Sequence, residues 1–305
     1  MKFEIITPCK NEEQNIVKFY ECIKKILNNY NYNIKFIDDG SDDKTWQEIK
    51  KICEINNNVS GLKLLKNYGK ENAIAAGIED KINNFDFKII VDVDLQHPIE
   101  IIPQMIKRWE QGEKVVGTYR EQFQEGFVRE IGSSLFYFFM KKFSDVNLFS
   151  KTTDFMLIDQ DICKKYIQIT EKNKTFRATI YLIHNALDLI KIKINNRKKN
   201  TSKFGFTTLT KFAINTFTSF SIFPLKIIGY VGLFLSALSI LLIPILFFVN
   251  YMNLIPVSLQ TIIIILLVFL NGLVLISNGI LAIYITKIYE NVISRPGFII
   301  EKKIN

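Results

Sequence analysis

Charged side chains are absent from one long stretch of this 305-residue chain. They make up 23% of the sequence, yet none lies between Lys226 and Lys287. Such a gap has room for two apolar helices of about 20 residues, each long enough to cross a hydrocarbon layer roughly 30 Å thick. The rest of the chain has the mixed composition of a soluble α/β domain. The missing charge therefore predicts a soluble part followed by a membrane part.

Acidic residues are absent from the stretch that precedes this gap. The whole chain has a net charge of +9, and eight basic residues without an acid fall between 191 and 226. A basic run before an apolar segment is typical of contact with an anionic membrane face or a phosphate ligand. Nucleic acid is the competing partner for basic charge. We expect no nucleic-acid partner, because this run leads directly into the membrane part.

Cysteine and histidine are scarce, with four and two residues. The cysteines show no paired spacing, which is typical of reduced thiols in a cytosolic setting and disfavours a zinc cluster. No Gly-x-Gly-x-x-Gly fingerprint follows the first apolar strand, and no Walker A lysine motif occurs. A dinucleotide dehydrogenase and a P-loop ATPase are therefore disfavoured.

Short apolar runs alternate with segments whose apolar residues recur at helical spacing. The expected strands are 3–7, 33–37, 62–65, 88–91 and 114–117, and the expected helices are 16–27, 46–52, 71–82 and 98–109. This alternation predicts an α/β fold with a mostly parallel, Rossmann-like sheet. In such sheets ligands bind at the carboxyl ends of the strands.

Polar clusters follow the first, second and fourth expected strands. The fourth strand ends in Asp92 and Asp94, which point to the same side because the side chains of a strand alternate. With Gln96 two residues further on, they offer hard oxygen ligands for Mg²⁺ or Mn²⁺ beside a diphosphate. The plainer alternative is a polar strand exit, with Asp as a turn former. Asp38 and Asp39 can accept hydrogen bonds from a base and a ribose, or form an Asx turn, or do both.

Several motifs in this order resemble glycosyltransferase family 2, and more narrowly the polyprenyl-phosphate hexosyltransferases, which include bactoprenol glucosyltransferases and dolichol-phosphate mannose synthases. The matching stretches are Thr-Pro-Cys-Lys-Asn-Glu at 7–12, Asp-Asp-Gly-Ser at 38–41, Asn-Tyr-Gly-Lys-Glu at 67–71, Asp-Val-Asp-Leu-Gln-His-Pro at 92–98, Asp-Phe-Met-Leu at 154–157 and Ser-Lys-Phe at 202–204. The resemblance spans nearly the whole chain. It implies a GT-A fold and an inverting transfer from a nucleotide sugar to a lipid phosphate.

The resemblance also implies roles for individual residues. The nucleotide-binding set is Pro8, Asn11, Glu12, Asp38, Asp39 and Asp92. The set for Mg²⁺ or Mn²⁺ is Asp92, Asp94 and Gln96, and the catalytic pair is Asp94 and Asp154. The acceptor-phosphate set is Arg120, Arg129, Arg197, Ser202 and Lys203. There are departures from the family pattern: Met156 stands where an arginine is usual, Asn200 where a glycine is common and Lys66 where an arginine is frequent.

A lipid phosphate needs no general base to become a nucleophile. A phosphate monoester has a second pKa near 6, so it is largely dianionic at neutral pH. Asp154 is then expected to orient the sugar or to stabilise positive character at its anomeric carbon. The alternative for Asp154 is a structural acid.

The membrane part is expected in four pieces after a catalytic domain at 1–204. Residues 205–226 read as an amphipathic helix at the interface, 227–249 and 259–285 as transmembrane helices, and 286–305 as a tail. The connector at 250–258 carries no charge, whereas Lys and Arg flank both ends of the apolar region. The positive-inside rule then predicts an inner-membrane protein with its catalytic domain and both termini in the cytoplasm. Asn271 and Asn278 offer polar contacts within the membrane, between spans or within a homo-oligomer.

The sequence therefore predicts an enzyme that transfers a hexose to polyprenyl (undecaprenyl) phosphate. UDP-glucose is the expected donor, with GDP-mannose as the alternative. A different membrane acceptor, such as a diacylglycerol or a glycan, is the second alternative. A membrane scaffold that keeps nucleotide binding without catalysis is the third.

Overall fold

The computed structural model describes residues 1–80, 84–120, 152–169, 174–185, 187–193, 225–232, 259–293 and 296–304, with single residues between 234 and 248. The chain divides into two compact units. One holds every strand described, including the C-terminal one, and the other holds the long helix α10. Each unit is described by itself.

The first unit is built on an eight-stranded sheet of order β7-β5-β6-β4-β1-β2-β3-β8. Its strands are β1 (Phe3–Cys9), β2 (Tyr32–Asp38), β3 (Val59–Leu64), β4 (Phe87–Ile90), β5 (Val115–Arg120), β6 (Thr152–Asp159), β7 (Asp188–Ile192) and β8 (Ile300–Ile304). The pairs β1–β2, β1–β4, β2–β3 and β5–β7 are parallel, whereas β6 and β8 run antiparallel to their neighbours. The predicted α/β fold with a mostly parallel sheet is confirmed.

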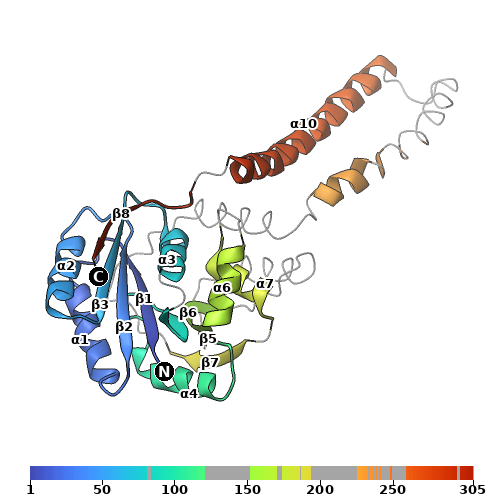
Figure 1. Ribbon diagram of the computed structural model, residues 1–305. Helices are drawn as coiled ribbons and strands as arrows, with labels where there is room; N and C mark the ends of the chain where they lie inside the picture. Colours follow the sequence, from blue (N-terminus) through green and yellow to red (C-terminus); the bar gives the residue numbers. More distant parts are fainter. Residues whose placement is uncertain are drawn as a thin grey trace. The chain divides into compact units, whose positions relative to one another are not determined.

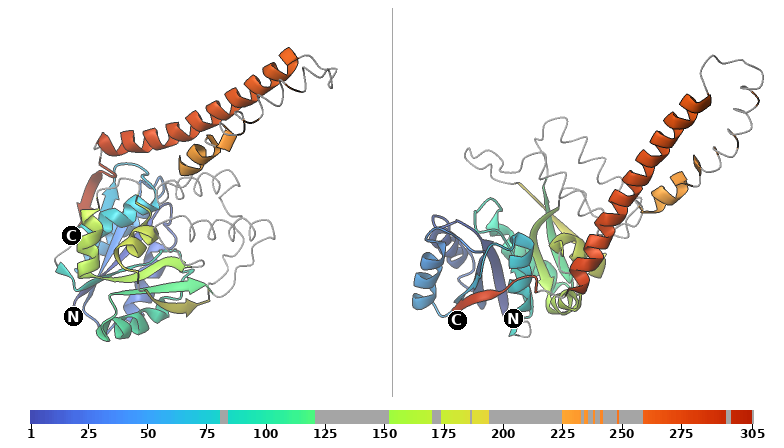
Figure 2. Two further views of the ribbon diagram at one scale, coloured as in Figure 1. Left: turned by 90° about the vertical axis from the view of Figure 1, so that its right-hand side faces the viewer. Right: turned by 90° about the horizontal axis from the view of Figure 1, so that it is seen from above.

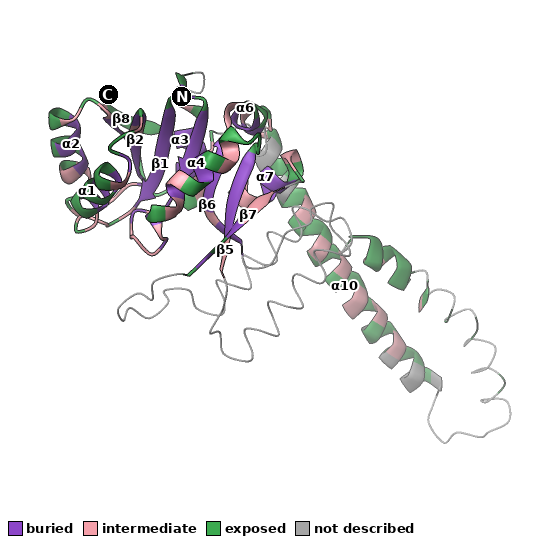
Figure 3. Ribbon diagram, turned by 90° about the horizontal axis from the view of Figure 1, so that it is seen from below, coloured by how far each residue is buried: buried purple, intermediate pink, exposed green. Residues whose placement is uncertain are grey.

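Helices cover both faces of this sheet because its strands are apolar on both faces (Figure 1). The helices are α1 (Ile16–Ile26), α2 (Thr45–Ile55), α3 (Lys70–Glu79), the short 3₁₀ helix η2 (Ile99–Ile101), α4 (Ile102–Glu110), α6 (Gln160–Gln168) and α7 (Phe176–Ile183). One core packs α1, α2 and α4 against residues such as Phe36 and Ile89. The other packs α3, α6 and α7 against residues such as Ile6 and Ile90. Figure 3 shows the central strands as the buried layer.

The third strand begins earlier than the sequence predicts. After Val59, its first residues are Ser60 and Gly61, which are poor strand formers, and Gly61 is unusual in a strand. A β-carbon at Gly61 would lie 2.8 Å from Ile49, so glycine there lets α2 approach the sheet. Helix packing, which the local pattern does not reveal, extends this strand.

Strand β8 is an unexpected part of the sheet. It comes from the segment predicted as a tail, and it pairs antiparallel with β3, Leu64 opposite Ile300, so that β8 becomes the edge of the sheet (Figure 2). Leu65 donates its amide to the carbonyl of Ile299 as well, at 2.9 Å. Lys303 bonds to Asp80 at the end of α3. The chain therefore returns to complete the domain that it left after β7.

The second unit is represented by α10 (Leu259–Val292). Within the part of the chain that is described, one helix has the length and composition of a membrane span, and its apolar window is Phe269–Thr286. No residue of that window is buried. Asn271 donates its side-chain amide to the carbonyl of Leu267 in its own helix. The predicted segments at 205–226 and 227–249 lie largely outside the described residues.

Candidate functional site

The loops after β1 and β2 are joined by backbone hydrogen bonds. Asn11 donates its amide to Ser41 Oγ at 3.0 Å, and its side-chain oxygen accepts from the amide of Asp42 at 2.9 Å. Asn11 has a φ of 55°, a conformation in which Asn is enriched. Glu12 donates its amide to Thr45 Oγ1 at 2.9 Å, so the first loop also contacts the start of α2. These contacts fix the first two rim loops relative to each other.

Asp39 joins the loop after β2 to the start of α3. Its carboxylate accepts from the amides of Tyr68 at 2.7 Å and Gly69 at 2.9 Å. Gly40 permits this approach, because a β-carbon there would lie 2.5 Å from the carbonyl carbon of Lys66 and the residue has a φ of 64°. Burial raises the pKa of the Asp39 carboxyl, while the two amides favour its charged form.

Asp38 lies deeper than Asp39. It is fully buried and accepts the amide of Ser41 at 3.0 Å, which is the Asx turn that the sequence allows. The pKa of its carboxyl is above the ordinary value, because the effect of burial outweighs the hydrogen bonds from Ser41, which lower that pKa. Asp38 therefore stabilises the turn of the loop after β2 from a buried position.

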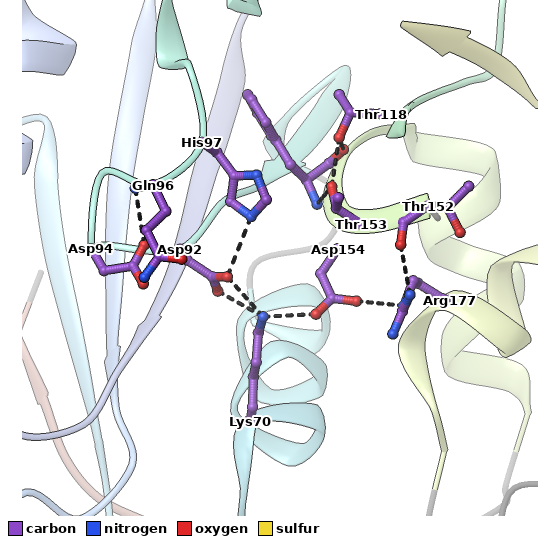
Figure 4. A network of polar contacts seen from close by, with 11 residues as sticks. Lys70, Asp92, Asp94, Gln96, His97, Thr118, Thr152, Thr153, Asp154 and Arg177 are labelled. Carbon is purple, nitrogen blue, oxygen red and sulfur yellow. Dashed lines mark hydrogen bonds and ion pairs between the residues drawn. The ribbon is translucent and has the colours of Figure 1, made fainter. Parts of the chain in front are cut away.

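The chain turns sharply after β4 and presents Asp92 and Asp94. Leu95, between Asp94 and Gln96, has a φ of 57°, which is uncommon outside glycine and typical of functional turns. The amide of Gln96 donates to Asp94 Oδ1 at 3.2 Å. Figure 4 shows Asp94 beside Gln96, while Asp92 points toward Lys70.

Lys70, the first residue of α3, bridges two acids from different strands. Its Nζ lies 2.8 Å from Asp92 Oδ1, 2.9 Å from Asp92 Oδ2 and 2.7 Å from Asp154 Oδ2 (Figure 4). Burial lowers the pKa of the Lys70 ammonium, but the charges of Asp154 and Asp92 outweigh it and raise that pKa above its ordinary value. Lys70 is therefore a cation that Asp92 and Asp154 share.

Each of the two acids has a second partner on its other side. His97, which is 5% exposed, has Nε2 at 3.7 Å from Asp92 Oδ2. Arg177 has Nε at 2.9 Å from Asp154 Oδ1 and donates from Nη1 to the carbonyl of Thr152 at 2.7 Å. Burial raises the pKa of both carboxyls, yet Lys70 and these partners hold both pKa values below the ordinary one.

Glu71 connects α3 to α7 beside this cluster. Its Oε2 accepts the amide of Phe176, the residue before Arg177, at 2.6 Å. Burial and then the charge of Asp154 raise the pKa of Glu71 to about 7. The contact holds the start of α7, and with it Arg177, close to Asp154.

These loops surround a cavity of about 360 Å³. The predicted nucleotide residues Pro8, Glu12, Asp39 and Asp92 line it, together with Asp94 and Lys70. Asn11 and Asp38 support the loops that carry that lining. The structure thus brings the predicted nucleotide residues together with Asp92 and Asp94 on one rim, while Gln96 follows them in the turn and is not among the lining residues.

The predicted acceptor residues are only partly described. Arg120 ends β5 at the same rim, opposite Ile192 of β7. The other four, Arg129, Arg197, Ser202 and Lys203, lie outside the described residues. Their roles remain predictions.

Sequence reasoning missed Lys70, His97 and Arg177. Lys70 and His97 stand inside motifs that matched the family, but neither was given a role. Arg177 is the only charged residue of α7 and could have been noticed for that reason. Met156, where the sequence departs from the pattern that the resemblance implies, is fully buried. The guanidinium beside Asp154 belongs to Arg177 of α7.

The donor set suits a hard divalent cation. Across the described residues no three His, Cys, Asp or Glu side chains gather as a metal cluster. Mg²⁺ does not require one, since it commonly takes one or two carboxylates and completes its shell with water and substrate phosphates. Asp92 and Asp94 at the cavity supply two such oxygens, and Asp92 already holds a cation in the form of Lys70.

Comparison with known proteins shows the family of this chain. Residues 4–167 match glycosyl transferase family 2. The chain is 33% identical to Bacillus subtilis CsbB, a protein named as a glycosyltransferase, covering 98% of this chain and 91% of that one. It is 32% identical to the bactoprenol glucosyl transferase of Shigella phage SfII, covering 99% and 98%.

A solved structure shares the fold of the first unit. Glucosyl-3-phosphoglycerate synthase from Mycobacterium tuberculosis, crystallised with Mn²⁺, UDP-glucose and phosphoglyceric acid, aligns with a TM-score of 0.50. The sequence identity is 16%, over 72% of this chain and 79% of that one. The rim therefore belongs to a GT-A-like α/β fold. The chain is a member of glycosyl transferase family 2, and it is a glycosyltransferase.

Proposed function

We propose that this glycosyltransferase transfers a hexose from a nucleotide sugar to a polyprenyl phosphate at the membrane. The observation that carries the proposal is the likeness to bactoprenol glucosyl transferases over 99% of the chain, membrane part included. Bactoprenol is a polyprenol, so a lipid phosphate is the acceptor that these relatives suggest. The same names favour glucose, with UDP as the expected carrier and GDP-mannose as the alternative.

The nucleotide sugar would occupy the cavity between the loops after β1, β2 and β4. Asp39, Pro8 and Glu12 line the side where we expect the nucleoside, and Asp92 and Asp94 the side of the diphosphate. Asp92, Asp94 and Gln96 would hold Mg²⁺ or Mn²⁺. When bound, such an ion would neutralise the charge that grows on the leaving diphosphate.

The chemistry needs no proton transfer from the protein. An oxygen of the dianionic lipid phosphate forms a bond to the anomeric carbon, while the bond from that carbon to the diphosphate breaks. The electron pair of the broken bond leaves with the nucleoside diphosphate, and attack from the opposite face inverts the anomeric centre. Asp154 lies across the cluster from Asp92 and would stabilise positive character at that carbon.

The path of the chain supports two membrane crossings. The chain leaves the sheet at the end of β7 and re-enters it at β8, so any crossings between them must be even in number. α10 supplies one candidate crossing. We infer that 227–249 supplies the other, which keeps the catalytic domain and the C-terminus on one side, the cytoplasm.

The chain leaves the sheet for the membrane part, and returns from it, at the same rim that carries the cavity. β7 runs parallel to β5 and ends at this rim, and β8 begins opposite Leu64, where β3 ends at it. The segments that lead to and from the membrane part therefore join the sheet at the rim that carries the cavity, and we propose that the lipid phosphate reaches the cavity at this rim. Arg120 at the rim, and Arg129, Arg197, Ser202 and Lys203 beyond the described residues, are the proposed acceptor-phosphate set.

A donor screen tests the proposal. The full-length protein in detergent, with Mn²⁺ and a polyprenyl lipid extract, is given radiolabelled UDP-glucose or GDP-mannose. We expect label from UDP-glucose to enter the organic phase, and only when lipid phosphate is present. If only label from GDP-mannose entered the organic phase, GDP-mannose would be the donor. If label from both donors stayed in the aqueous phase, the proposal would be rejected.

A further inference from the structure

The bridge at Lys70 occupies the carboxylate that a metal would need. Both oxygens of Asp92 lie within 3 Å of the Lys70 ammonium, at 2.8 and 2.9 Å. A divalent cation that binds Asp92 must take at least one of these oxygens. Two cations cannot share the same face of one carboxylate without strong repulsion.

We infer that Lys70 is an exchangeable counter-ion for Asp92. It holds Asp92 beside Asp154 when the site contains no metal, and it releases Asp92 when a divalent cation enters. The inference rests on the metal-dependent donor binding of the proposed function, and it adds a positioning residue to that site.

The surroundings of Lys70 permit such an exchange. The lysine side chain is 40% exposed, compared with 26% for Asp92 and 18% for Asp154. It extends from the first turn of α3, directly after Gly69, whose φ is 90° and around which a β-carbon would find no atom within 4 Å. A long, open side chain can change partners at low cost, whereas the two acids are held on strand ends.

Both acids keep a partner when Lys70 moves. Asp154 retains Arg177 at 2.9 Å, and Asp92 retains His97 at 3.7 Å on its other side. Among the residues drawn in Figure 4, Lys70 is the one joined to both acids, so it is the partner that they share. When Lys70 releases Asp92, neither carboxylate is therefore left without a partner.

In the competing role, Lys70 stays bound to Asp92 permanently and holds it in the position in which it binds the metal. The two roles predict opposite changes in metal affinity when Lys70 is removed. If Lys70 competes with the metal, its removal strengthens metal binding in the absence of nucleotide. If Lys70 orders the site, its removal weakens that binding.

Mn²⁺ alone is the probe, and the free-ion signal in electron paramagnetic resonance is the readout. The full-length protein in detergent is titrated as wild type, Lys70→Met and Lys66→Met, without nucleotide or lipid. Lys66 is an exposed lysine four residues before Lys70, between β3 and α3, so its substitution matches the change in charge. We expect Lys70→Met to bind Mn²⁺ about fivefold more tightly or better, and Lys66→Met to bind like the wild type.

Unchanged or weaker Mn²⁺ binding by Lys70→Met overturns the inference, as does an equal gain in Lys66→Met. If Lys70→Met does not fold, Lys70→Gln takes its place with the same expectation. If neither the wild type nor the variant binds Mn²⁺, the inference also falls. Sugar transfer to lipid in the presence of EDTA would then show whether the proposed function survives without it.

Discussion

The two halves of the cavity are held together in different ways. On the side of β1 and β2, backbone amides fix the loops: Asn11 bonds the next loop, and Asp39 receives two amides from the start of α3. On the side of β4 and β6, Asp92 and Asp154 are held by side-chain ion pairs to Lys70. Amide–carboxylate bonds in buried loops are directional and persistent, while ion pairs of long side chains exchange partners.

This difference matches what each half would bind. A nucleoside presents the same donors and acceptors in every state, so a preformed surface suits it. A diphosphate with its metal brings new charge, and the acids that receive it must be balanced both before and after binding. The contrast leads us to expect loss of catalysis from changes in the ion-paired half and loss of affinity from changes in the amide-fixed half.

The largest effect is expected at Asp92. Asp92→Asn removes a proposed metal ligand and the partner of Lys70, and transfer should fall by about a thousandfold, within the range for loss of a central electrostatic group. Steady-state transfer to lipid measures it. Asp161→Asn, at an exposed acid that pairs with Lys114 away from the cavity, is the control and should keep full activity. Residual activity within tenfold of the wild type would mean that Asp92 is not a required metal ligand.

A smaller loss is expected at Asp154. Asp154→Asn keeps the shape of the side chain but loses the charge that we propose acts on the sugar, so kcat should fall by about a hundredfold, as for one electrostatic group. The KM for the nucleotide sugar should change by less than threefold. Unchanged turnover in a folded variant would make Asp154 a structural acid.

In the amide-fixed half the effect should be on affinity. Asp39→Ala leaves the amide of Tyr68 without its acceptor, which costs about 1–3 kcal/mol for an unpaired group, while the amide of Gly69 keeps Asn67 Oδ1 at 3.0 Å. We expect the KM for the nucleotide sugar to rise about tenfold while kcat stays within threefold. An equal fall in kcat with an unchanged KM would contradict the division into two halves.

The smallest effect is a pH dependence at Glu71, where the two halves meet. Its folded pKa of about 7 lies above the ordinary 4.5, so the folded protein binds more protons than the unfolded chain between these values. Glu71 therefore lowers stability as pH rises through this window, by about 1–3 kcal/mol. Glu71→Gln should flatten the dependence of the melting temperature on pH between 5 and 8, roughly the window of that pKa. A slope identical to the wild type would exclude Glu71 as its source.

Much of the first half of the chain could be predicted from its sequence. The strands before Asp39 and Asp92 are short and mostly apolar, and strand ends of a parallel sheet converge on one rim. That reasoning placed Pro8, Glu12, Asp39 and Asp92 on one cavity, as observed.

The sequence did not predict the contacts that depend on distant segments. β8 is a five-residue strand with three charged residues, and it forms because the edge of β3 is available to it. Arg177 lies 23 positions beyond Asp154 and meets it only because α7 packs beside β6 and Glu71 holds its first turn. Local periodicity carries no information on either pairing.

The central claim is that the lipid phosphate receives a hexose and nothing else. The direct measurement is mass spectrometry of purified polyprenyl phosphate after incubation with the full-length protein, UDP-glucose and Mn²⁺. We expect the lipid to gain the mass of one anhydrohexose while one UDP is released for each lipid converted. A lipid that gains a hexose phosphate, or UDP release that leaves the lipid unchanged, would contradict the account.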